Sequence, residues 1–305
     1  LDFLYSDEDK ITEDGKIRHL PFFKPDWSPD LFLTMMYTNH LAAYRTSLVR
    51  QVGGLRTAYN GSQDYDFTLR FMEHSDNTRV GHIPKVLYHW RERRESVAFA
   101  MNSKNYASEA ARHAKEDSIR RKGLNARLEP IPGMSQYRMV YEVTGQPLVS
   151  IIIPSKDHPE VLRQCIDSIR EFTRYSHYEI LVVDNGSSEE NRRDIGEYLA
   201  AAGARYIYEK AEFNFSKMCN TGAACAHGEY LLFLNDDIEI FQPEWLERML
   251  GQAQQPHTGA VGAKLFYPFT TTIQHTGVAN LRTEGPVHSL MTCEDSVPYY
   301  FGWNW

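Results

Sequence analysis

The stretch YLLFLNDDIEI, residues 230–240, decides the fold class of this 305-residue chain. Its apolar and aromatic run is followed, after a single asparagine, by the carboxylates of Asp236 and Asp237. This order is typical of a buried parallel strand, whose polar groups begin where the strand leaves the sheet. In open α/β sheets, ligands bind just beyond the carboxyl ends of the strands. We therefore expect both acids at the rim of a binding site, where they can hold a divalent metal and, through it, a phosphate.

Strand and helix patterns alternate around this stretch. Strands are predicted at residues 148–153, 178–184, 204–210 and 230–237. Helices are predicted at residues 159–173, 189–202, 213–228 and 243–252, the third of them preceded by a loop. Such alternation is typical of βαβ units. The sequence therefore predicts an α/β fold with a Rossmann-like, mostly parallel sheet and flanking helices.

A second version of the deciding stretch stands at the start of the chain. LDFLYSDEDK, residues 1–10, is also an apolar run that ends in acids. When the two stretches are aligned, Asp7 falls opposite Asn235 and Asp9 opposite Asp237. The chain is therefore expected to hold parts of two similar domains, at residues 1–100 and 147–305, joined by a helical and extended linker at 101–146.

The overall composition and charge argue against several classes of protein. The net charge of −7 gives no electrostatic reason to bind nucleic acid. No apolar run reaches the roughly 20 residues of a membrane span, and the acidic start does not resemble a signal peptide. The four cysteines show no metal-ligand spacing, so we interpret them as reduced cytosolic thiols. They are Cys165, Cys219, Cys225 and Cys293.

Acids follow three of the predicted strands at what would be one rim of the sheet. They are Asp157, Asp184, and the pair Asp236 and Asp237. A carboxylate can accept from a ribose hydroxyl or a base N–H, whereas beside phosphates it needs a metal to offset repulsion. Asp157 and Asp184 are thus expected to hold a nucleoside, and Asp237 a metal on its diphosphate. Singly, each acid is better explained as a turn residue; four at one rim favour a site.

Several motifs of other enzyme classes are missing from the sequence. It has no GxGxxG after the first strand, no GxxxxGK[ST] and no GxSxG, which argues against a dinucleotide dehydrogenase, a P-loop nucleotidase and an α/β-hydrolase. Asp64 falls in the first turn of a predicted helix, where the helix dipole alone would explain a carboxylate. His89 and His275 are isolated in sequence, but His89 follows a strand in the same part of the chain as Asp7 and Asp9.

These residues resemble a known family. The segments SIIIPSKDHPE, EILVVDNGSS, FNFSKMCNTGAACAHGEYLLFLNDDIE and GAVGAKLFYP are similar to the N-terminal half of a family 2 glycosyltransferase with the type A nucleotide-sugar fold. The segments YSDEDK, PDWSPDLFLTMMYTNHLAAYR, VGG, NGSQDYDFTLR and HIPKVLYHWR are similar to its C-terminal half. Nearly the whole chain is covered, and the nearest resemblance is to tandem-domain enzymes of bacterial surface-polysaccharide synthesis.

The resemblance implies a role for each candidate residue. Nucleotide-sugar binding is implied for Asp157, Asp184, Asn185, Asn220 and Asp236. Metal binding through the Asp-x-Asp motif is implied for Asp237 and, in the first part, for Asp7, Asp9 and His89. Asp64 would be the catalytic base, taking a proton from the acceptor hydroxyl as it attacks the anomeric carbon with inversion.

The implied cofactor is Mg²⁺ or Mn²⁺, and the implied partners are a nucleoside-diphosphate sugar and a glycan or lipid-linked acceptor. The implied location is the cytoplasm, with the inner face of the membrane as an open alternative.

The departures from the family pattern leave three interpretations open. The first part lacks base-binding strands, the second lacks a counterpart of Asp64, and Asn235 stands where many relatives carry the first acid of the motif. The chain is therefore expected to be a fragment across two tandem domains, with little or no activity of its own. Alternatively, the two parts dock as a circular permutation of one fold and share Asp64, Asp184 and Asp237. A third interpretation is a nucleotide-sugar-binding module or scaffold without turnover.

Overall fold

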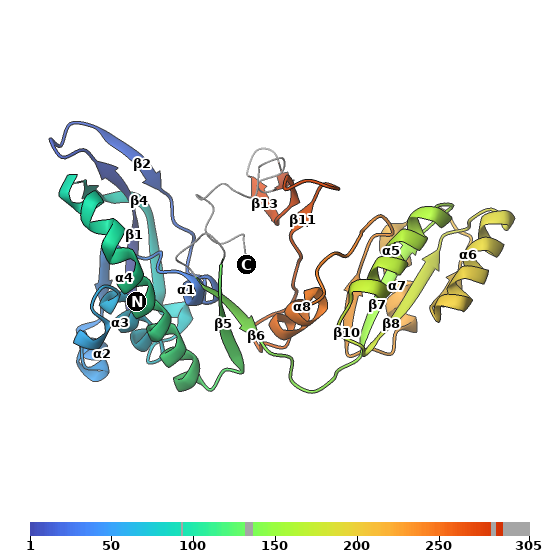
Figure 1. Cartoon of the computed structure of the whole chain (residues 1–305), viewed down its shortest axis with the longest axis horizontal. Helices are drawn as coiled ribbons and strands as arrows, with labels where there is room; N and C mark the ends of the chain where they lie inside the picture. The colour runs from blue at the N-terminus through green and yellow to red at the C-terminus, as the bar shows by residue number, and fades with distance from the viewer. Residues whose placement is uncertain (93, 132–136, 282–284, 289–305) are drawn as a thin grey trace. The chain divides into compact units, whose positions relative to one another are not determined.

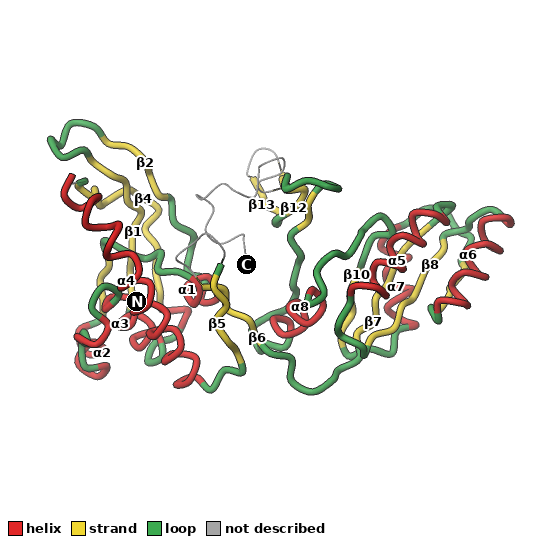
Figure 2. The backbone as a smooth tube through the Cα atoms, viewed as in Figure 1, coloured by secondary structure: helices red, strands yellow, loops and turns green. Residues whose placement is uncertain are grey.

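The computed structural model describes residues 1–92, 94–131, 137–281 and 285–288, and these form two compact units (Figures 1 and 2). The first unit holds Leu1–Tyr141 and the described residues from Ala263 onward, and the second holds Glu142–Gly262. Most of the expected linker therefore packs with the first unit, and how the units map onto tandem domains stays a prediction. In the described part of the chain, every helix is too short or too polar to cross a membrane.

The second unit is built on a four-stranded parallel sheet. Its strands are β7 (Val149–Ser155), β8 (Tyr178–Asp184), β9 (Arg205–Tyr208) and β10 (Tyr230–Phe233). The spatial order is β10-β7-β8-β9, so the chain winds outward through β8 and β9 and then returns to the other edge of β7. The predicted α/β class with a parallel sheet is confirmed here. The winding direction reverses between β7 and β10, which is where ligands bind in such sheets.

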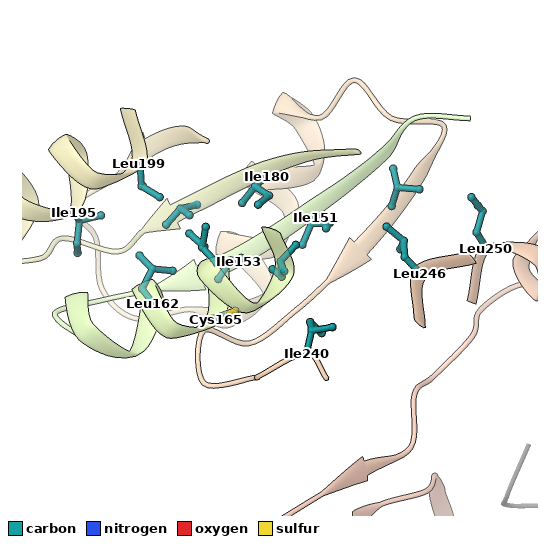
Figure 3. Packing of buried hydrophobic residues seen from close by; sticks show 14 residues of the cluster. Ile151, Ile153, Leu162, Cys165, Ile180, Ile195, Leu199, Ile240, Leu246 and Leu250 are labelled. Carbon is teal, nitrogen blue, oxygen red and sulfur yellow. The ribbon is translucent and has the colours of Figure 1, made fainter. Parts of the chain in front are cut away.

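Helices cover both faces of this sheet. They are α5 (Pro159–Phe172), α6 (Glu189–Ala202), α7 (Phe215–Cys225) and α8 (Trp245–Ala253). Alternate residues of β7 point to opposite faces. Ile151 and Ile153 pack with α5, α6 and α8 (Figure 3). Ile152 packs with Met218 of α7. Burying each of these isoleucines contributes about 1.5–3 kcal/mol. This two-sided core fixes the ends of β7, β8 and β10 in space.

Local sequence sets the limits of α6. The Ser188 hydroxyl accepts from the Asn191 N–H, and Glu189 lies in the first turn, near the positive end of the helix dipole. Gly203 ends the helix with φ of 72°, a conformation that costs glycine little. The predicted helix at 189–202 is confirmed. Strand β10 is shorter than predicted, so Asp236 and Asp237 lie beyond its end.

The first unit is built around β1 (Phe3–Ile11). This strand pairs antiparallel with β2 (Arg18–Phe22) and β3 (Ala42–Tyr44), and parallel with β4 (Val80–Arg91). The sheet is therefore mixed, not mostly parallel. The expectation that the strand ends at its acids is wrong for β1, because β2 and β4 pair with its second half and carry it through Asp7 and Asp9 to Ile11.

The remaining elements of the first unit are helices and short hairpins. The helices are α1 (Pro29–Thr34), α2 (Thr46–Val52), α3 (Gln63–Met72) and α4 (Arg94–Lys122), with short 3₁₀ turns at Thr57–Tyr59 and Asn77–Arg79. The hairpins pair β5 (Ala126–Pro130) with β6 (Tyr137–Tyr141), β11 (Leu265–Phe266) with β12 (Ile273–His275), and β13 (Val278–Leu281) with β14 (Gly285–His288).

The core of the first unit is rich in aromatic side chains. Phe3 of β1 stacks on Tyr44 of β3 with ring centroids 4.7 Å apart, and Phe71 of α3 packs against both rings. Ser28 caps α1, because its hydroxyl accepts from the Leu31 N–H. Ser62 precedes α3 but does not cap it through its side chain, since its hydroxyl donates to the Ala107 carbonyl of α4. A hydrogen bond to a residue distant in sequence has thus replaced the local bond to the helix N-terminus.

Candidate functional site

Asp157 joins the end of β7 to the start of α6. Its Oδ1 accepts from the Ser188 N–H at 2.8 Å and from Asn191 Nδ2 at 3.0 Å. These two hydrogen bonds lower the pKa of Asp157. The residue has φ of 56°, a left-handed conformation that Asp tolerates better than most side chains. Asp157 therefore stays ionised at the rim of the sheet.

Asp184, at the end of β8, is fully buried. Its Oδ1 accepts from the N–H groups of Gly186 at 2.9 Å and Ser187 at 2.8 Å, and the Tyr206 hydroxyl donates to Oδ2. The carboxylate thus shapes the loop that follows its own strand. The interpretation that Asp184 holds a base stays a prediction, and a direct contact would require it to exchange one of these partners.

Asn185 is buried beside Asp184. Its side-chain amide donates to the Ala211 carbonyl at 3.1 Å, and its backbone N–H donates to the Ser155 carbonyl at 3.1 Å. Asn220, on α7, is exposed. Asn185 therefore connects the end of β8 to Ala211 and to the end of β7. The exposed Asn220 can contact a ligand.

Asp236 and Asp237 differ sharply in their surroundings. Asp236 Oδ2 accepts from the Ser155 hydroxyl at 2.7 Å and lies 3.9 Å from His158 Nδ1. Asp237 is exposed, and within the described residues its carboxylate has no hydrogen-bond or ion-pair partner. One acid is thus anchored to the end of β7, and its neighbour is available to a ligand.

Two serines that sequence reasoning missed hold this rim together. Ser155 contacts Asp236 through its hydroxyl and Asn185 through its carbonyl. The Ser187 hydroxyl accepts from the Asp157 N–H at 2.8 Å, and its own N–H donates to Asp184. Each serine stands at or just after a strand end, which is the signal that could have found it. The structure therefore brings four of the predicted acids and amides into one hydrogen-bonded rim.

The rim suits a metal ion that is coordinated mainly by the phosphates of a bound nucleotide and by water. Within the described residues, no three His, Cys, Asp or Glu side chains come together as a metal site. Mg²⁺ commonly needs only one or two carboxylates when phosphates and water supply the other ligands. The unpaired Asp237 carboxylate beside the anchored Asp236 fits that requirement.

The acids of β1 lie in a different environment. Asp7 Oδ1 accepts from the Lys24 N–H at 2.9 Å and from His82 Nε2 at 2.8 Å. Asp9 accepts from Arg18 Nε at 2.6 Å and from His89 Nδ1 at 2.5 Å, so the expected neighbour His89 does reach it. Both carboxylates are buried, 2% and 5% exposed.

The carboxylates of Asp7 and Asp9 are therefore already hydrogen-bonded to other residues of this chain. Burial alone would raise the pKa of Asp9, but the hydrogen bonds from His89 and Arg18 outweigh it and lower the pKa. A divalent ion would have to displace the Arg18 guanidinium, which repels it. These residues as arranged do not fit a metal, and metal binding by Asp7, Asp9 and His89 stays a prediction. His82 lies on β4 as His89 does, and no sequence motif marked it.

Asp64 lies in the first turn of α3, as predicted, and is half-buried. Its carboxylate accepts from the Asn39 side-chain amide and from the Tyr65 N–H at 2.9 Å. The Asn39 carbonyl accepts from Lys24 Nζ, which lies 3.4 Å from Glu8 Oε2. A polar chain thus links Asp64 to β1, and neither Asn39 nor Lys24 was singled out from the sequence.

The helix that carries Asp64 is held by a buried ion cluster. Asp66 is fully buried, and its Oδ2 accepts from Arg56 Nε and Arg70 Nε, both at 3.0 Å. Arg70 also donates to the carbonyls of Val52 and Gly54. The cluster ties α3 to the end of α2 and so fixes the position of Asp64.

This geometry can be compared with known proteins. Residues 150–286 match the family model described as glycosyl transferase family 2. This family 2 segment runs from Ser150 in β7 past the end of β10, and thus includes the whole rim from Asp157 to Asp237. The resemblance seen in the sequence is confirmed at this level, whereas the tandem arrangement stays a prediction.

Relatives extend the similarity along the chain. An uncharacterized protein, y4gI, of Sinorhizobium fredii is 42% identical over 280 residues, covering 90% of this chain and 30% of its own length. The O-antigen biosynthesis protein RfbC of Myxococcus xanthus is 40% identical over 278 residues, covering 91% of this chain and 21% of its own. The chain thus spans less than a third of either relative.

Among solved structures, the mannosyltransferase PcManGT from Pyrobaculum calidifontis, in complex with GDP-Man and Mn²⁺, is 18% identical. The match covers 54% of this chain and 45% of that one. Its TM-score is 0.36, which is too low to carry an argument about this chain.

Proposed function

We propose that this chain is part of an inverting, metal-dependent glycosyltransferase of surface-polysaccharide synthesis. The substrates would be a nucleoside-diphosphate sugar and a hydroxyl of a glycan or lipid-linked acceptor. The observation that carries the proposal is the rim of the family 2 segment, where the unpaired Asp237 follows β10 at the reversal of strand order. The similarity to an O-antigen biosynthesis protein supports the kind of product.

The second unit would bind the donor. Asp157 keeps one carboxylate oxygen outside its hydrogen bonds to Ser188 and Asn191, so it can accept from the nucleoside. Asp237, positioned by its anchored neighbour Asp236, would hold Mg²⁺ or Mn²⁺ with the diphosphate. When bound, such an ion offsets the negative charge that develops on the departing diphosphate.

The first unit would supply a catalytic base. Asp64 is half-buried and is oriented by the Asn39 amide, which leaves acceptor capacity on its carboxylate. It would take the proton of the acceptor hydroxyl as the oxygen attacks the anomeric carbon from the side opposite the diphosphate. In the tandem interpretation, Asp64 serves the domain that ends in the first unit, and Asp237 serves the next domain.

The test is release of nucleoside diphosphate from UDP-, GDP- and dTDP-sugars by the purified chain with Mn²⁺. We expect release from at least one donor and a loss of at least tenfold in Asp237→Asn. The matched control is Glu239→Gln, an exposed acid two residues further along. Equal release by wild type and Asp237→Asn would overturn the metal role. Nucleotide binding without release from any donor would favour a binding module.

A further inference from the structure

Three aromatic side chains gather on one face of the first unit. The His40 ring stacks on Tyr88 with centroids 5.2 Å apart at 15°, and it packs on Trp90 with centroids 4.5 Å apart at 50°. Tyr88 and Trp90 are two residues apart on β4, so they project from the same face of the strand. We call His40, Tyr88 and Trp90 the aromatic platform.

The platform is open to solvent. Trp90 is 48% exposed, and the His40 side chain is 33% exposed. Single exposed apolar residues are ordinary on a protein surface, whereas several rings gathered beside polar groups mark an interaction site. Large aromatic rings with polar edges are also the side chains that contribute most to binding.

Charged groups line the edge of the platform. In the β1–β4 register Glu8 lies beside Tyr88, and Lys10 lies beside Trp90. Glu8 Oε2 accepts from the His40 N–H at 2.6 Å and from His40 Nδ1 at 2.9 Å. Lys10 Nζ lies 5.6 Å from the Trp90 ring centroid and 3.2 Å from Glu92 Oε1, an ion pair that leaves other N–H groups of the ammonium able to donate. The Glu8 side chain is 13% exposed, and its Oε1 lies outside the contacts made by Oε2. The edge therefore offers one hydrogen-bond acceptor and one donor.

The same contacts connect the platform to the proposed base. Lys24 Nζ, which lies 3.4 Å from Glu8 Oε2, donates to the Asn39 carbonyl, and the Asn39 amide donates to Asp64. Asn39 and His40 are also adjacent in sequence. A ring held on the platform would thus contact His40, whose neighbour in sequence is a direct hydrogen-bond partner of Asp64.

A sugar ring fits this combination. Its C–H face is apolar and packs on aromatic rings, while its hydroxyls both donate and accept hydrogen bonds, as Glu8 and Lys10 require. A nucleotide fits less well, because the carboxylate of Glu8 would repel its phosphates. We propose that the aromatic platform binds a sugar ring of the acceptor glycan. This inference rests on the proposed function, since only a glycosyltransferase would need an acceptor sugar beside Asp64.

The test is saturation-transfer difference NMR on the whole chain with the methyl glycosides of glucose, galactose, mannose and rhamnose as probes. We expect saturation transfer to at least one glycoside, reduced at least fivefold in both Trp90→Ala and Trp90→Leu. The second variant keeps apolar bulk and removes the aromatic face. The matched control is Leu55→Ala, an apolar residue outside β4 that is 63% exposed. Circular dichroism would verify that each variant is folded.

Three outcomes would overturn the proposal that the aromatic platform binds a sugar ring. They are no transfer to any of the four glycosides, equal transfer in wild type and both Trp90 variants, and Trp90-dependent transfer to UDP in place of glycosides. Titration of the same samples with UDP and Mn²⁺ separates this inference from the proposed function. If metal-dependent UDP binding persists while glycoside binding is missing, the platform is wrong and the proposed donor site stands.

Discussion

Replacing Lys115 by Met should stabilise the first unit at neutral pH. Lys115 lies on α4 and is 2% exposed, with its ammonium group 5.6 Å from the Tyr65 ring centroid and 5.7 Å from that of Tyr137. It donates one hydrogen bond to the Thr34 carbonyl at the end of α1. Burial lowers the pKa of Lys115 from its usual 10.5 to about 8. The charged form is therefore costly to bury.

The difference between the pKa of Lys115 in the unfolded and folded protein determines how much its replacement changes the free energy of unfolding. The fall in the Lys115 pKa from 10.5 to about 8 corresponds to about 3 kcal/mol of unfavourable free energy for the charged form at pH 7. Methionine has a similar shape and no charge, but it leaves the Thr34 carbonyl without this donor, at a cost of about 1–2 kcal/mol. We therefore expect Lys115→Met to raise the free energy of unfolding by about 1–2 kcal/mol at pH 7.

The sign of the effect should reverse at high pH. Between pH 8 and 10.5, unfolded wild type keeps the proton on Lys115 and the folded protein has lost it. The stability of wild type relative to the variant therefore rises with pH across this window. Above pH 10.5 the charge penalty is gone, and the variant should be less stable than wild type by about 1–2 kcal/mol.

Urea unfolding followed by circular dichroism, at pH 7 and pH 10.5, measures both differences. Titration of other groups is common to the two proteins and cancels in the comparison. Lys16→Met is the control, because the Lys16 side chain is 80% exposed, and it should change stability by less than about 0.5 kcal/mol. The reasoning is refuted if Lys115→Met is strongly destabilising at pH 7, or if its effect does not depend on pH.

Three further predictions concern the scaffold. Gly222→Ala should destabilise the second unit by about 1–3 kcal/mol in urea unfolding, because the new methyl group would collide with Ile152; Gly259→Ala, with open space around it, should have no such effect. Asp66→Ala should cost about 3–5 kcal/mol, since it removes the buried carboxylate that Arg56 and Arg70 share, and an unchanged urea midpoint would disprove that role. The ion pair with Asp9 stabilises the fold above about pH 4 and is lost as pH falls through the lowered pKa, so Arg18→Gln should weaken the acid dependence of stability in a pH titration.

Much of the second unit could be predicted from its sequence, because its signals are local. The apolar run of β7 is buried on both faces, and the predicted helix at 189–202 is reproduced from Glu189 to Ala202. The burial of Asp184 could not be predicted, since it depends on backbone N–H groups that turn back only after the strand has ended. Ser155 and Ser187 stand at strand ends, but their partners Asp236 and Asp157 lie 81 and 30 residues away in sequence.

The first unit was harder to predict because its decisive contacts are distant in sequence. Asp7 and Asp9 were expected beyond a strand end, but pairing with β2 and β4 keeps them inside β1. Serine before a helix usually caps it, but the Ser62 hydroxyl donates instead to the Ala107 carbonyl, 45 residues away. Likewise, Asn39 donates to Asp64 from a loop whose sequence contains no motif that predicts this contact.

The central claim is that the rim at Asp237 binds a nucleoside diphosphate through a divalent metal. Calorimetric titration of the whole chain with UDP and with GDP, each in the presence of Mn²⁺ and again with EDTA, tests it most directly. We predict binding of at least one nucleotide that requires the metal and is lost in Asp237→Ala but kept in Glu239→Gln. Binding that is indifferent to EDTA or to Asp237→Ala, or no binding of either nucleotide, would contradict the claim.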